Sequence, residues 1–193
     1  MNDNMQTRKT LLERVADPHD DLSWDEFYNF YKDYVFVIVV NMGVDRHNAN
    51  DLVQEIFVKA WKALPDFDYS SRKGRFRSWI ATITKNTVRT RFRDSSRRPQ
   101  TDELGEDLFR HEAQINKIIE VEWKKFVASK ALETIKSEFS EKYIEAFIDL
   151  MHGMKVTDAA EKYGLKEPTL HVYKTRIQKR LCREIKRLNY ELN

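Results

Sequence analysis

The chain has 193 residues and carries 34 Lys and Arg against 31 Asp and Glu, which gives a net charge of +3. With five Gly, four Pro and 34% charged residues, we expect a mostly helical, soluble protein of one large or two small domains. A single cysteine, Cys182, excludes an internal disulfide and predicts a reducing, cytoplasmic setting. The longest apolar run, Tyr34 to Val40, is too short to span a bilayer, and residues 1–10 lack the apolar centre of a signal peptide.

Residues 7–41 predict two helices. The first is short, places Leu11, Leu12 and Val15 on one side, and ends at Asp17-Pro18. The second begins with Ser23-Trp24-Asp25-Glu26, which has the pattern of a capping box, and runs to about Asn41. The β-branched run at 35–40 could form a strand instead, but there is no second strand nearby to pair with it. The face that this helix is expected to bury consists of Phe27, Phe30, Tyr31, Tyr34, Val35 and Ile38.

The next helix is predicted to start around Asn48 to Asn50 and to end at Leu64-Pro65. Its inner stripe consists of Leu52, Val53, Ile56, Phe57 and Ala60. The residues that should face outward are Asp51, Gln54, Glu55, Val58 and Lys59, with Trp61 near the edge. A turn-rich loop, residues 65–73, follows and carries Phe67 and Tyr69.

The segment from Arg72 to Arg98 is strongly basic, with ten Lys and Arg against the single acidic residue Asp94. Its apolar residues recur near a helical period and predict one buried face, which consists of Phe76, Trp79, Ile80, Ile83, Val88 and Phe92. The residues predicted to face solvent are Arg77, Thr84, Lys85, Arg89 and Arg93. A helix with one apolar and one basic face is typical of a nucleic-acid binder. The alternative, a solvated basic helix without a partner, would be costly through self-repulsion.

The second half of the chain begins with a change in composition. Residues 101–107 carry four acidic residues and no cation, which predicts a flexible linker over residues 99–111. Helices resume near Glu112 and after Ser140. Val156 to Tyr163, a turn at residues 164–166, and a helix with Pro168 in its first turn together describe a helix-turn-helix. The second of these helices, together with Lys166 just before it, carries eight Lys and Arg against Glu167 and Glu184.

Three of these segments resemble bacterial sigma factors. Asn48 to Leu64, NANDLVQEIFVKAWKAL, resembles the helix by which that family docks on RNA polymerase. Phe76 to Arg93, FRSWIATITKNTVRTRFR, is similar to the segment that melts and reads the −10 promoter element. The helix-turn-helix occupies the position of the −35 reader, and the compact extracytoplasmic-function (ECF) group is the closest match. Thr84, Thr90 and the recognition-helix residues depart from the common pattern, so no promoter sequence can be transferred.

The resemblance implies an all-α fold of two small helical domains. An N-terminal extension, residues 1–22, would precede a region 2-like domain at residues 23–98. The flexible linker at residues 99–111 would join it to a region 4-like helix-turn-helix domain at residues 112–193. The implied function is that of a sigma factor, which binds core RNA polymerase, recognises the −10 and −35 elements and melts the promoter.

The resemblance also assigns residues. The core polymerase contacts would be Asp51, Gln54 and Glu55. The −10 contacts would be Phe67, Asn86, Arg89, Arg93, Arg97 and Arg98, with the four arginines on phosphates. The −35 contacts would be Thr169, His171, Val172, Thr175, Arg176 and Lys179. Phe67 is interpreted equally well as a hydrophobic anchor for its loop.

The expected partners are core RNA polymerase and promoter DNA, and the sequence leaves open whether an anti-sigma factor also binds. No nucleotide-binding glycine loop, nucleophile–base pair or metal-ligand cluster is visible in the sequence, so we expect neither an enzyme nor a cofactor. The alternative function is a conventional helix-turn-helix regulator that binds duplex DNA without polymerase. Such a regulator would not need the helix at residues 48–64 or the basic helix.

Overall fold

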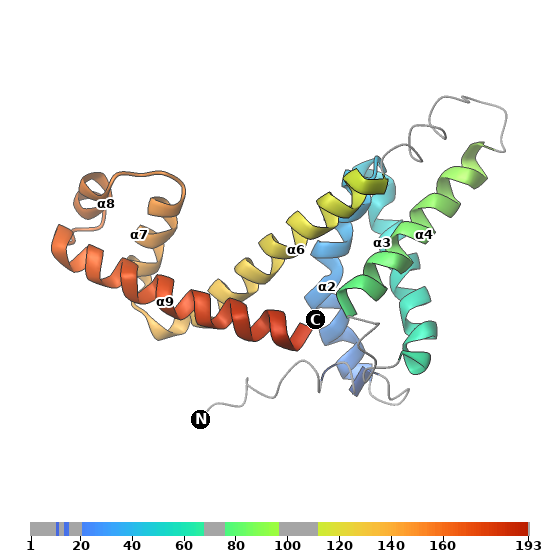
Figure 1. Cartoon of the computed structure of the whole chain (residues 1–193), viewed down its shortest axis with the longest axis horizontal. Helices are drawn as coiled ribbons and strands as arrows, with labels where there is room; N and C mark the ends of the chain where they lie inside the picture. Colours follow the sequence, from blue (N-terminus) through green and yellow to red (C-terminus); the bar gives the residue numbers. More distant parts are fainter. Residues whose placement is uncertain (1–10, 12–13, 16–20, 68–75, 97–111, 193) are drawn as a thin grey trace. The chain divides into compact units, whose positions relative to one another are not determined.

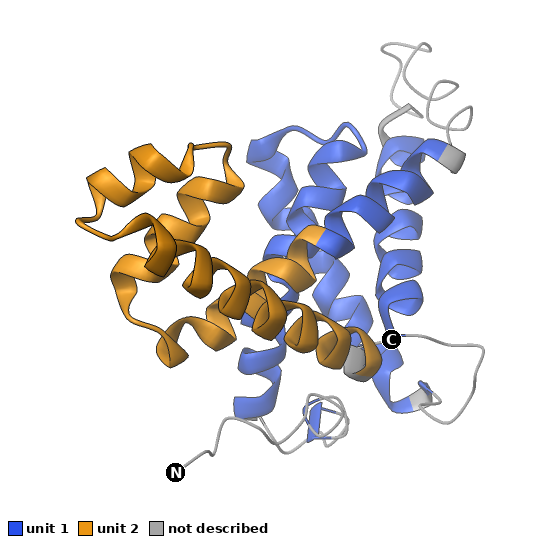
Figure 2. Ribbon diagram, turned by 60° about the vertical axis from the view of Figure 1, so that its left-hand side comes forward, with its two compact units in different colours: residues 1–124, 191–193 blue, residues 125–190 orange. Residues whose placement is uncertain are grey.

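The computed structural model describes residues 11, 14–15, 21–67, 76–96 and 112–192 (Figure 1). These residues form α-helices and two short 3-10 turns, and no strand occurs in the described ranges, which confirms the all-α prediction. The chain divides into two compact units, residues 1–124 with 191–193 and residues 125–190 (Figure 2). No helix in the described part of the chain is long and apolar enough to cross a lipid bilayer.

Unit 1 is built on α2 (Asp21–Asn41), α3 (Arg46–Ala63) and α4 (Phe76–Ser96). The whole predicted face of α2 is buried, and so is the inner stripe of α3. Phe27 lies at the centre of the core, with its ring 5.7 Å from Phe57 of α3 and 5.6 Å from Phe76 of α4. Both contacts are edge-on, the geometry that aromatic quadrupoles favour. One aromatic cluster therefore holds the three helices together.

Both predicted helix starts in unit 1 were wrong. α3 begins at Arg46 because Asp45 is its N-cap, with a carboxylate that accepts from the backbone N–H of His47 at 3.0 Å and Asn48 at 3.1 Å. The Asn48 side-chain amide also donates to the Asp45 carboxylate, at 2.6 Å, and this bond, followed by the backbone bonds, holds the pKa of Asp45 below its usual range. α2 begins at Asp21, so Ser23 lies buried inside the first turn and is not its cap.

The buried face of α4 accommodates two threonines as well as apolar residues. Thr84 was predicted to face solvent, but it is fully buried, as is Thr87. The Thr84 hydroxyl donates to the carbonyl of Ile80 at 2.8 Å, and this bond within the helix removes most of the cost of burying it. The prediction failed because a hydroxyl that bonds to its own helix can be buried like an apolar side chain.

The first part of α6 (Glu112–Ile135) packs within unit 1. Trp123 is buried and meets the ring of Tyr34 edge-on at 5.3 Å, and the Arg77 guanidinium lies 5.8 Å from the centre of the Trp123 ring. Burial raises the pKa of Tyr34. The division between the units falls after Lys124, inside α6, whereas the sequence predicted a boundary at residues 99–111. Those linker residues lie outside the described part of the chain, so the linker stays a prediction.

Unit 2 contains the rest of α6, α7 (Glu141–Met151), α8 (Val156–Lys162) and α9 (Glu167–Leu192). One buried cluster joins α6, α7 and α9 and consists of Ile135, Ile144, Phe147 and Ile177. A second cluster of small and apolar residues lets α7, α8 and α9 approach closely, and consists of Ala146, Ala159, Ala160 and Leu170. The turn between α8 and α9 contains Gly164 at a φ of 60°, a conformation that glycine adopts without strain.

Polar contacts fix the ends of these helices. The Asp149 carboxylate on α7 accepts hydrogen bonds from Lys162 Nζ at 2.7 Å and from the Tyr163 hydroxyl at 2.6 Å. The bond from Lys162, followed by the bond from Tyr163, lowers the pKa of Asp149. The rings of Tyr143 on α7 and Tyr173 on α9 stack with their centres 3.7 Å apart and their planes 6° apart. The Asp149 bonds hold α8 against α7, and the tyrosine stack holds α9 against α7.

Candidate functional site

The exposed side of α3 brings together the three predicted polymerase contacts. Asp51, Gln54 and Glu55 are all exposed and follow the i, i+3, i+4 spacing that places residues on one side of a helix. Two large apolar residues share this side, Val58 with 49% and Trp61 with 48% of its surface exposed. We call these five residues the α3 outer face.

Sequence reasoning did not assign Val58 and Trp61 to the site. The available signal was that both are large and apolar yet lie off the inner stripe of an otherwise well-patterned helix. The Trp61 ring lies 6.4 Å from the ring of Trp24 on α2, so its position is supported from one side. Glu55 pairs with Lys59 at 2.7 Å, but both are exposed, and such a pair contributes little to stability. The α3 outer face is thus an apolar centre with a polar rim, as protein-binding surfaces often are.

The exposed side of α4 holds the predicted −10 contacts that can be described. Asn86 and Arg93 are exposed, and Arg89 is half-buried. Asn86, Arg89 and Arg93 follow an i, i+3, i+7 spacing, so they lie along one side of the helix. Arg97 and Arg98 lie outside the described residues.

Phe67 does not join Asn86. Its ring packs against Trp79 at 5.0 Å and edge-on against Phe76 at 6.1 Å, and the side chain is half-buried. Asn86 follows Trp79 by seven residues, which is about 10 Å along a helix axis. These contacts favour the interpretation of Phe67 as a hydrophobic anchor for its loop, and its role in binding a base stays a prediction.

The predicted −35 contacts occupy one exposed side of α9. His171, Val172, Thr175, Arg176 and Lys179 are exposed, whereas Thr169 is half-buried. Thr175 donates its hydroxyl to the carbonyl of His171 at 3.0 Å. The Arg176 guanidinium lies over the ring of Tyr173, 5.7 Å from its centre, so the tyrosine stack supports the base of this arginine.

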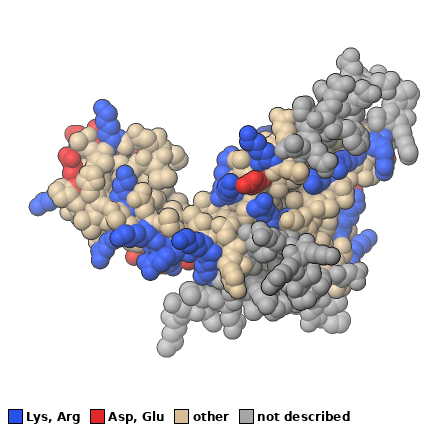
Figure 3. All heavy atoms as spheres, in the orientation of Figure 1, with Lys and Arg blue, Asp and Glu red and all other residues tan. Residues whose placement is uncertain are grey.

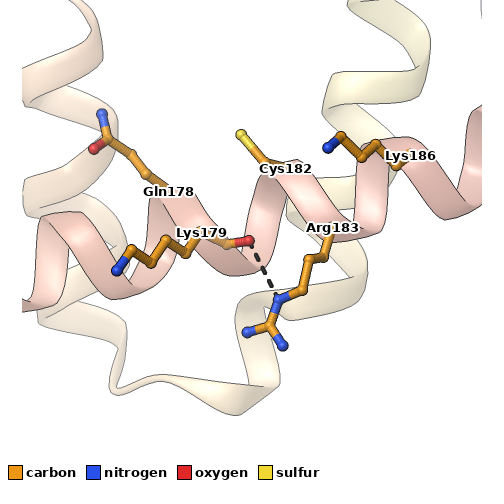
Figure 4. Close-up of a pocket in the computed structure, with 5 residues that line it drawn as sticks. All are labelled: Gln178, Lys179, Cys182, Arg183 and Lys186. Carbon is orange, nitrogen blue, oxygen red and sulfur yellow. Dashed lines mark hydrogen bonds between the residues drawn. The ribbon is translucent and has the colours of Figure 1, made fainter.

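Lys179 also lines a shallow open groove along α9 (Figure 4). The other lining residues all come from the same helix and are Gln178, Cys182, Arg183 and Lys186. Cys182 is exposed, and Arg183 donates from Nε to the carbonyl of Lys179 at 3.4 Å. Lys and Arg side chains gather along α9 in the space-filling view (Figure 3).

The flank of α9 next to its exposed side holds cations that are paired within unit 2. Arg180 binds Glu138 at 2.7 and 2.9 Å and Glu184 at 2.9 Å, and Arg187 also binds Glu184. Glu184 is only 3% exposed. Burial alone would raise the pKa of Glu184, but the hydrogen bonds from Arg187 and Arg180 outweigh it and hold that pKa below its usual range. The sequence counted Glu184 simply as a negative charge on the helix, and the structure corrects this: it is a buried ion-pair partner.

Within the described ranges, no group of three or more His, Cys, Asp or Glu side chains is placed to hold a metal ion. The predicted contact residues that the structure describes lie on three surfaces, which are the α3 outer face, the Asn86 side of α4 and the exposed side of α9.

Comparison with known proteins gives a match over one part of the chain. A family model described as Sigma-70 region 2 matches residues 27–98, which hold all of α3 and α4. The ECF RNA polymerase sigma factor SigK of Mycobacterium tuberculosis is 32% identical over 83 residues, 43% of this chain and 43% of SigK. The ECF RNA polymerase sigma factor SigE of Mycolicibacterium smegmatis is 26% identical over 80 residues, 42% of this chain and 30% of SigE. The match thus spans less than half the length of these relatives.

A solved structure, described as "Structure of CnrH in complex with the cytosolic domain of CnrY", covers 92% of this chain and 96% of that chain. Its sequence identity of 19% and TM-score of 0.38 are too low to carry an argument. These matches place residues 27–98 in the Sigma-70 region 2 family. Over less than half of its length, the chain is similar to ECF RNA polymerase sigma factors.

Proposed function

We propose that this protein is a sigma factor that binds core RNA polymerase and directs it to promoters, where it recognises the −10 and −35 elements and opens the duplex. The observation that carries the proposal is the region 2 match, because residues 27–98 contain both the α3 outer face and the Asn86 side of α4. A regulator that binds only duplex DNA would need neither surface. An anti-sigma factor is a further partner that family membership suggests, and no surface is assigned to it.

The α3 outer face is the proposed polymerase contact. Val58 and Trp61 offer apolar area that becomes favourable to bury once a partner covers it. Asp51, Gln54 and Glu55 form the rim and can receive hydrogen bonds and cations from the partner. The inner stripe of the same helix is buried in the core of unit 1, so replacing a rim residue should leave the fold intact.

The exposed side of α4 is the proposed −10 contact. Asn86 can both donate and accept, which suits the edge of one base that has left the duplex. Arg89 and Arg93 lie on the same side and are suited to phosphates, which add affinity without sequence choice. Recognition of an unstacked base together with phosphate binding on one helix is what strand opening requires.

The first turns of α9 are the proposed −35 reader. A helix-turn-helix places the N-terminal residues of its second helix against base edges in the major groove. His171, Val172, Thr175 and Arg176 are exposed there, and the tyrosine stack fixes the helix beneath them. This assignment extends the proposal to unit 2, which lies beyond the residues matched by region 2.

The decisive experiment is run-off transcription with purified core polymerase and promoter fragments from the native genome. We expect transcripts that depend on this protein and that core polymerase alone does not give. DNA binding without any dependence of transcription on the protein would contradict the proposal and leave the duplex-binding regulator.

Strand opening is tested by Asn86→Ala on a promoter that gives a transcript. The variant should still bind polymerase and duplex DNA but show weaker permanganate reactivity of unpaired thymines near −10. The expected loss of base discrimination is on the order of 1–3 kcal/mol. Thr82→Ala is the matched control, because Thr82 is an exposed neighbour on the same side whose hydroxyl donates to the carbonyl of Ser78 at 2.7 Å. Equal opening by both variants would remove Asn86 from the site.

A further inference from the structure

The exposed side of α9 continues far beyond its predicted reading end. His171, Thr175, Lys179, Cys182 and Lys186 follow spacings of four, four, three and four residues, which keep them on one side of a helix. From His171 to Lys186 the side is about 22 Å long, since each residue adds about 1.5 Å. The major groove of DNA is only about 12 Å wide. The far end of α9 therefore cannot lie over the same base edges as its first turns.

The side chains on this side also differ in charge between the first turns of α9 and its far end. The reading end carries three exposed residues without a fixed charge, His171, Val172 and Thr175, beside a single exposed cation, Arg176. The far end carries Lys179, Arg183 and Lys186, which are all exposed and line the shallow groove of Figure 4. Cations without an apolar centre suit a phosphate backbone better than they suit a protein surface.

The cations in the second half of α9 form two sets, those that pair with carboxylates of unit 2 and those that do not. Arg180 binds Glu138 and Glu184, and Arg187 binds Glu184. In the described part of the chain, no carboxylate pairs with Lys179, Arg183 or Lys186. Between Gln178 and Lys186 the outer side also presents no large apolar residue. The second half of α9 thus offers an uncompensated strip of positive charge to solvent.

We propose that Lys179, Arg183 and Lys186 form a phosphate clamp that holds the backbone of one DNA strand at the edge of the groove that the first turns of α9 enter. Arg183 and Lys186 are the new members, and the inference rests on the proposed function. The clamp adds affinity and fixes the register of the helix, and base choice remains with the first turns. α9 is thereby divided into a reading half and a holding half.

Cys182 provides a direct test because it is the chain's only cysteine and lies between two members of the clamp. The complete protein, bound to core polymerase and a promoter duplex that supports run-off transcription, is treated with a maleimide. Mass spectrometry of the Cys182 peptide then measures the rate of alkylation. The duplex should slow alkylation at least several-fold at low salt, and the protection should fade as salt rises. An unchanged rate on saturating duplex would overturn the proposal.

The second test is the triple variant Lys179→Gln/Arg183→Gln/Lys186→Gln. Removal of three phosphate contacts should reduce the slope of log affinity against log salt by about 2 to 3. The ratio of affinities for a promoter and for the same duplex with a scrambled −35 element should stay unchanged. The control removes the same charge from exposed lysines of unit 2 that do not belong to α9, as Lys125→Gln/Lys136→Gln/Lys142→Gln. That control should leave the slope unaltered.

The outcomes separate this inference from the proposed function. If the wild type directs transcription and the two triple variants have the same salt slope, the clamp is wrong and the sigma-factor function stands. If the clamp variant alters the affinity ratio for the −35 element, its residues read bases and the division of α9 is wrong. If the wild type gives no transcript with core polymerase, the proposed function itself fails.

Discussion

The α3 outer face and the exposed side of α9 are built on the same plan and differ in chemistry. Each is the solvent side of an amphipathic helix whose other side packs into a core. On α3 the exposed side gathers Val58 and Trp61 with carboxylates at the rim, whereas on α9 Glu184 is buried and Lys179, Arg183 and Lys186 are exposed. Burial of apolar area depends little on salt, but cation–phosphate binding weakens steeply as salt rises. The side-chain chemistry of each surface, and not the fold, therefore indicates its partner.

The largest expected effect is a loss of stability on removal of Glu184, the buried carboxylate of α9. Glu184→Ala should leave Arg180 and Arg187 without their shared buried partner. Removal of one member of a buried pair costs about 3–5 kcal/mol, and we expect the lower end because both arginines can still reach water. Urea unfolding followed by far-UV circular dichroism measures this loss. Glu138→Ala is the control, since Glu138 is 41% exposed and should matter much less. Equal stability of the wild type and Glu184→Ala would contradict the buried ion pair.

The Glu184 carboxylate also predicts that the stability of the folded protein depends on pH. The pKa of Glu184 is lowered in the folded protein, so its contribution to stability is present above the ordinary glutamate pKa, about 4.3. That contribution should be lost as pH falls through the lowered folded-state value. In urea unfolding from neutral pH into the acid range, the stability of the wild type should therefore approach that of Glu184→Gln. A difference between the two that persists undiminished at low pH would show that the carboxylate charge is not the cause.

The next largest effect should come from Trp61. An exposed aromatic residue at the centre of an interface is often a hot spot, and its truncation costs about 2 kcal/mol or more, roughly 30-fold in affinity. Trp61→Ala should weaken binding to core polymerase by at least this factor, measured by titration with labelled protein. The loss should be nearly the same at low and high salt. A loss that disappears in high salt would mean that the α3 outer face acts through charge.

Arg176 and Arg180 sharpen the comparison within α9, because they are one turn apart and differ in partners. Arg176→Ala should weaken binding to a promoter duplex several-fold and leave the melting temperature unchanged, since Arg176 is exposed. Arg180→Ala should lower the melting temperature, because Arg180 is bound to Glu138 and Glu184. Anisotropy titration measures duplex binding by both variants, and thermal melting measures their stability. If Arg176→Ala lowered the melting temperature and Arg180→Ala weakened duplex binding, the roles assigned to the two arginines would be wrong.

The smallest effect should come from the rim of α3. Gln54→Ala/Glu55→Ala should reduce polymerase binding only a few-fold, because rim residues remain partly solvated and contribute less than the centre. Co-purification with core polymerase at several protein concentrations would detect the change. A double variant that binds as well as the wild type would limit the docking surface to Val58 and Trp61.

Helical periodicity was enough to predict most of the fold, because apolar stripes in this chain are regular. The inner stripe of α3, the buried face of α2 and the helices after Ser140 were all predicted from spacing. Helix ends were harder: Asp45, Asn48 and Asn50 are all good N-caps, and local sequence does not say which carboxylate or amide reaches the free N–H groups. Only the structure shows that Asp45 does so.

The candidate site was predicted in part. Residues marked by the family pattern, such as Gln54 and Asn86, proved to be exposed on the expected sides. The burial of Glu184 could not be predicted, because its partner Arg180 also reaches Glu138, which is 42 residues away in sequence. Trp61 was placed near the edge of the outward residues, but spacing alone does not say how much of a ring at an edge is exposed. Long-range pairing and the choice of surface for an aromatic residue both depend on tertiary packing.

The uneven distribution of aromatic residues gives each unit its own spectroscopic signal. All four tryptophans, Trp24, Trp61, Trp79 and Trp123, belong to unit 1, and Tyr143, Tyr163, Tyr173 and Tyr190 are the aromatic chromophores of unit 2 with the largest absorbance. Fluorescence excited at the red edge of the absorption band therefore reports unit 1 alone, whereas far-UV ellipticity reports both units. Two non-coincident unfolding curves from a single unlabelled sample would show that the units melt independently. Trp61 is also exposed, so its emission provides a native optical probe for a partner on α3.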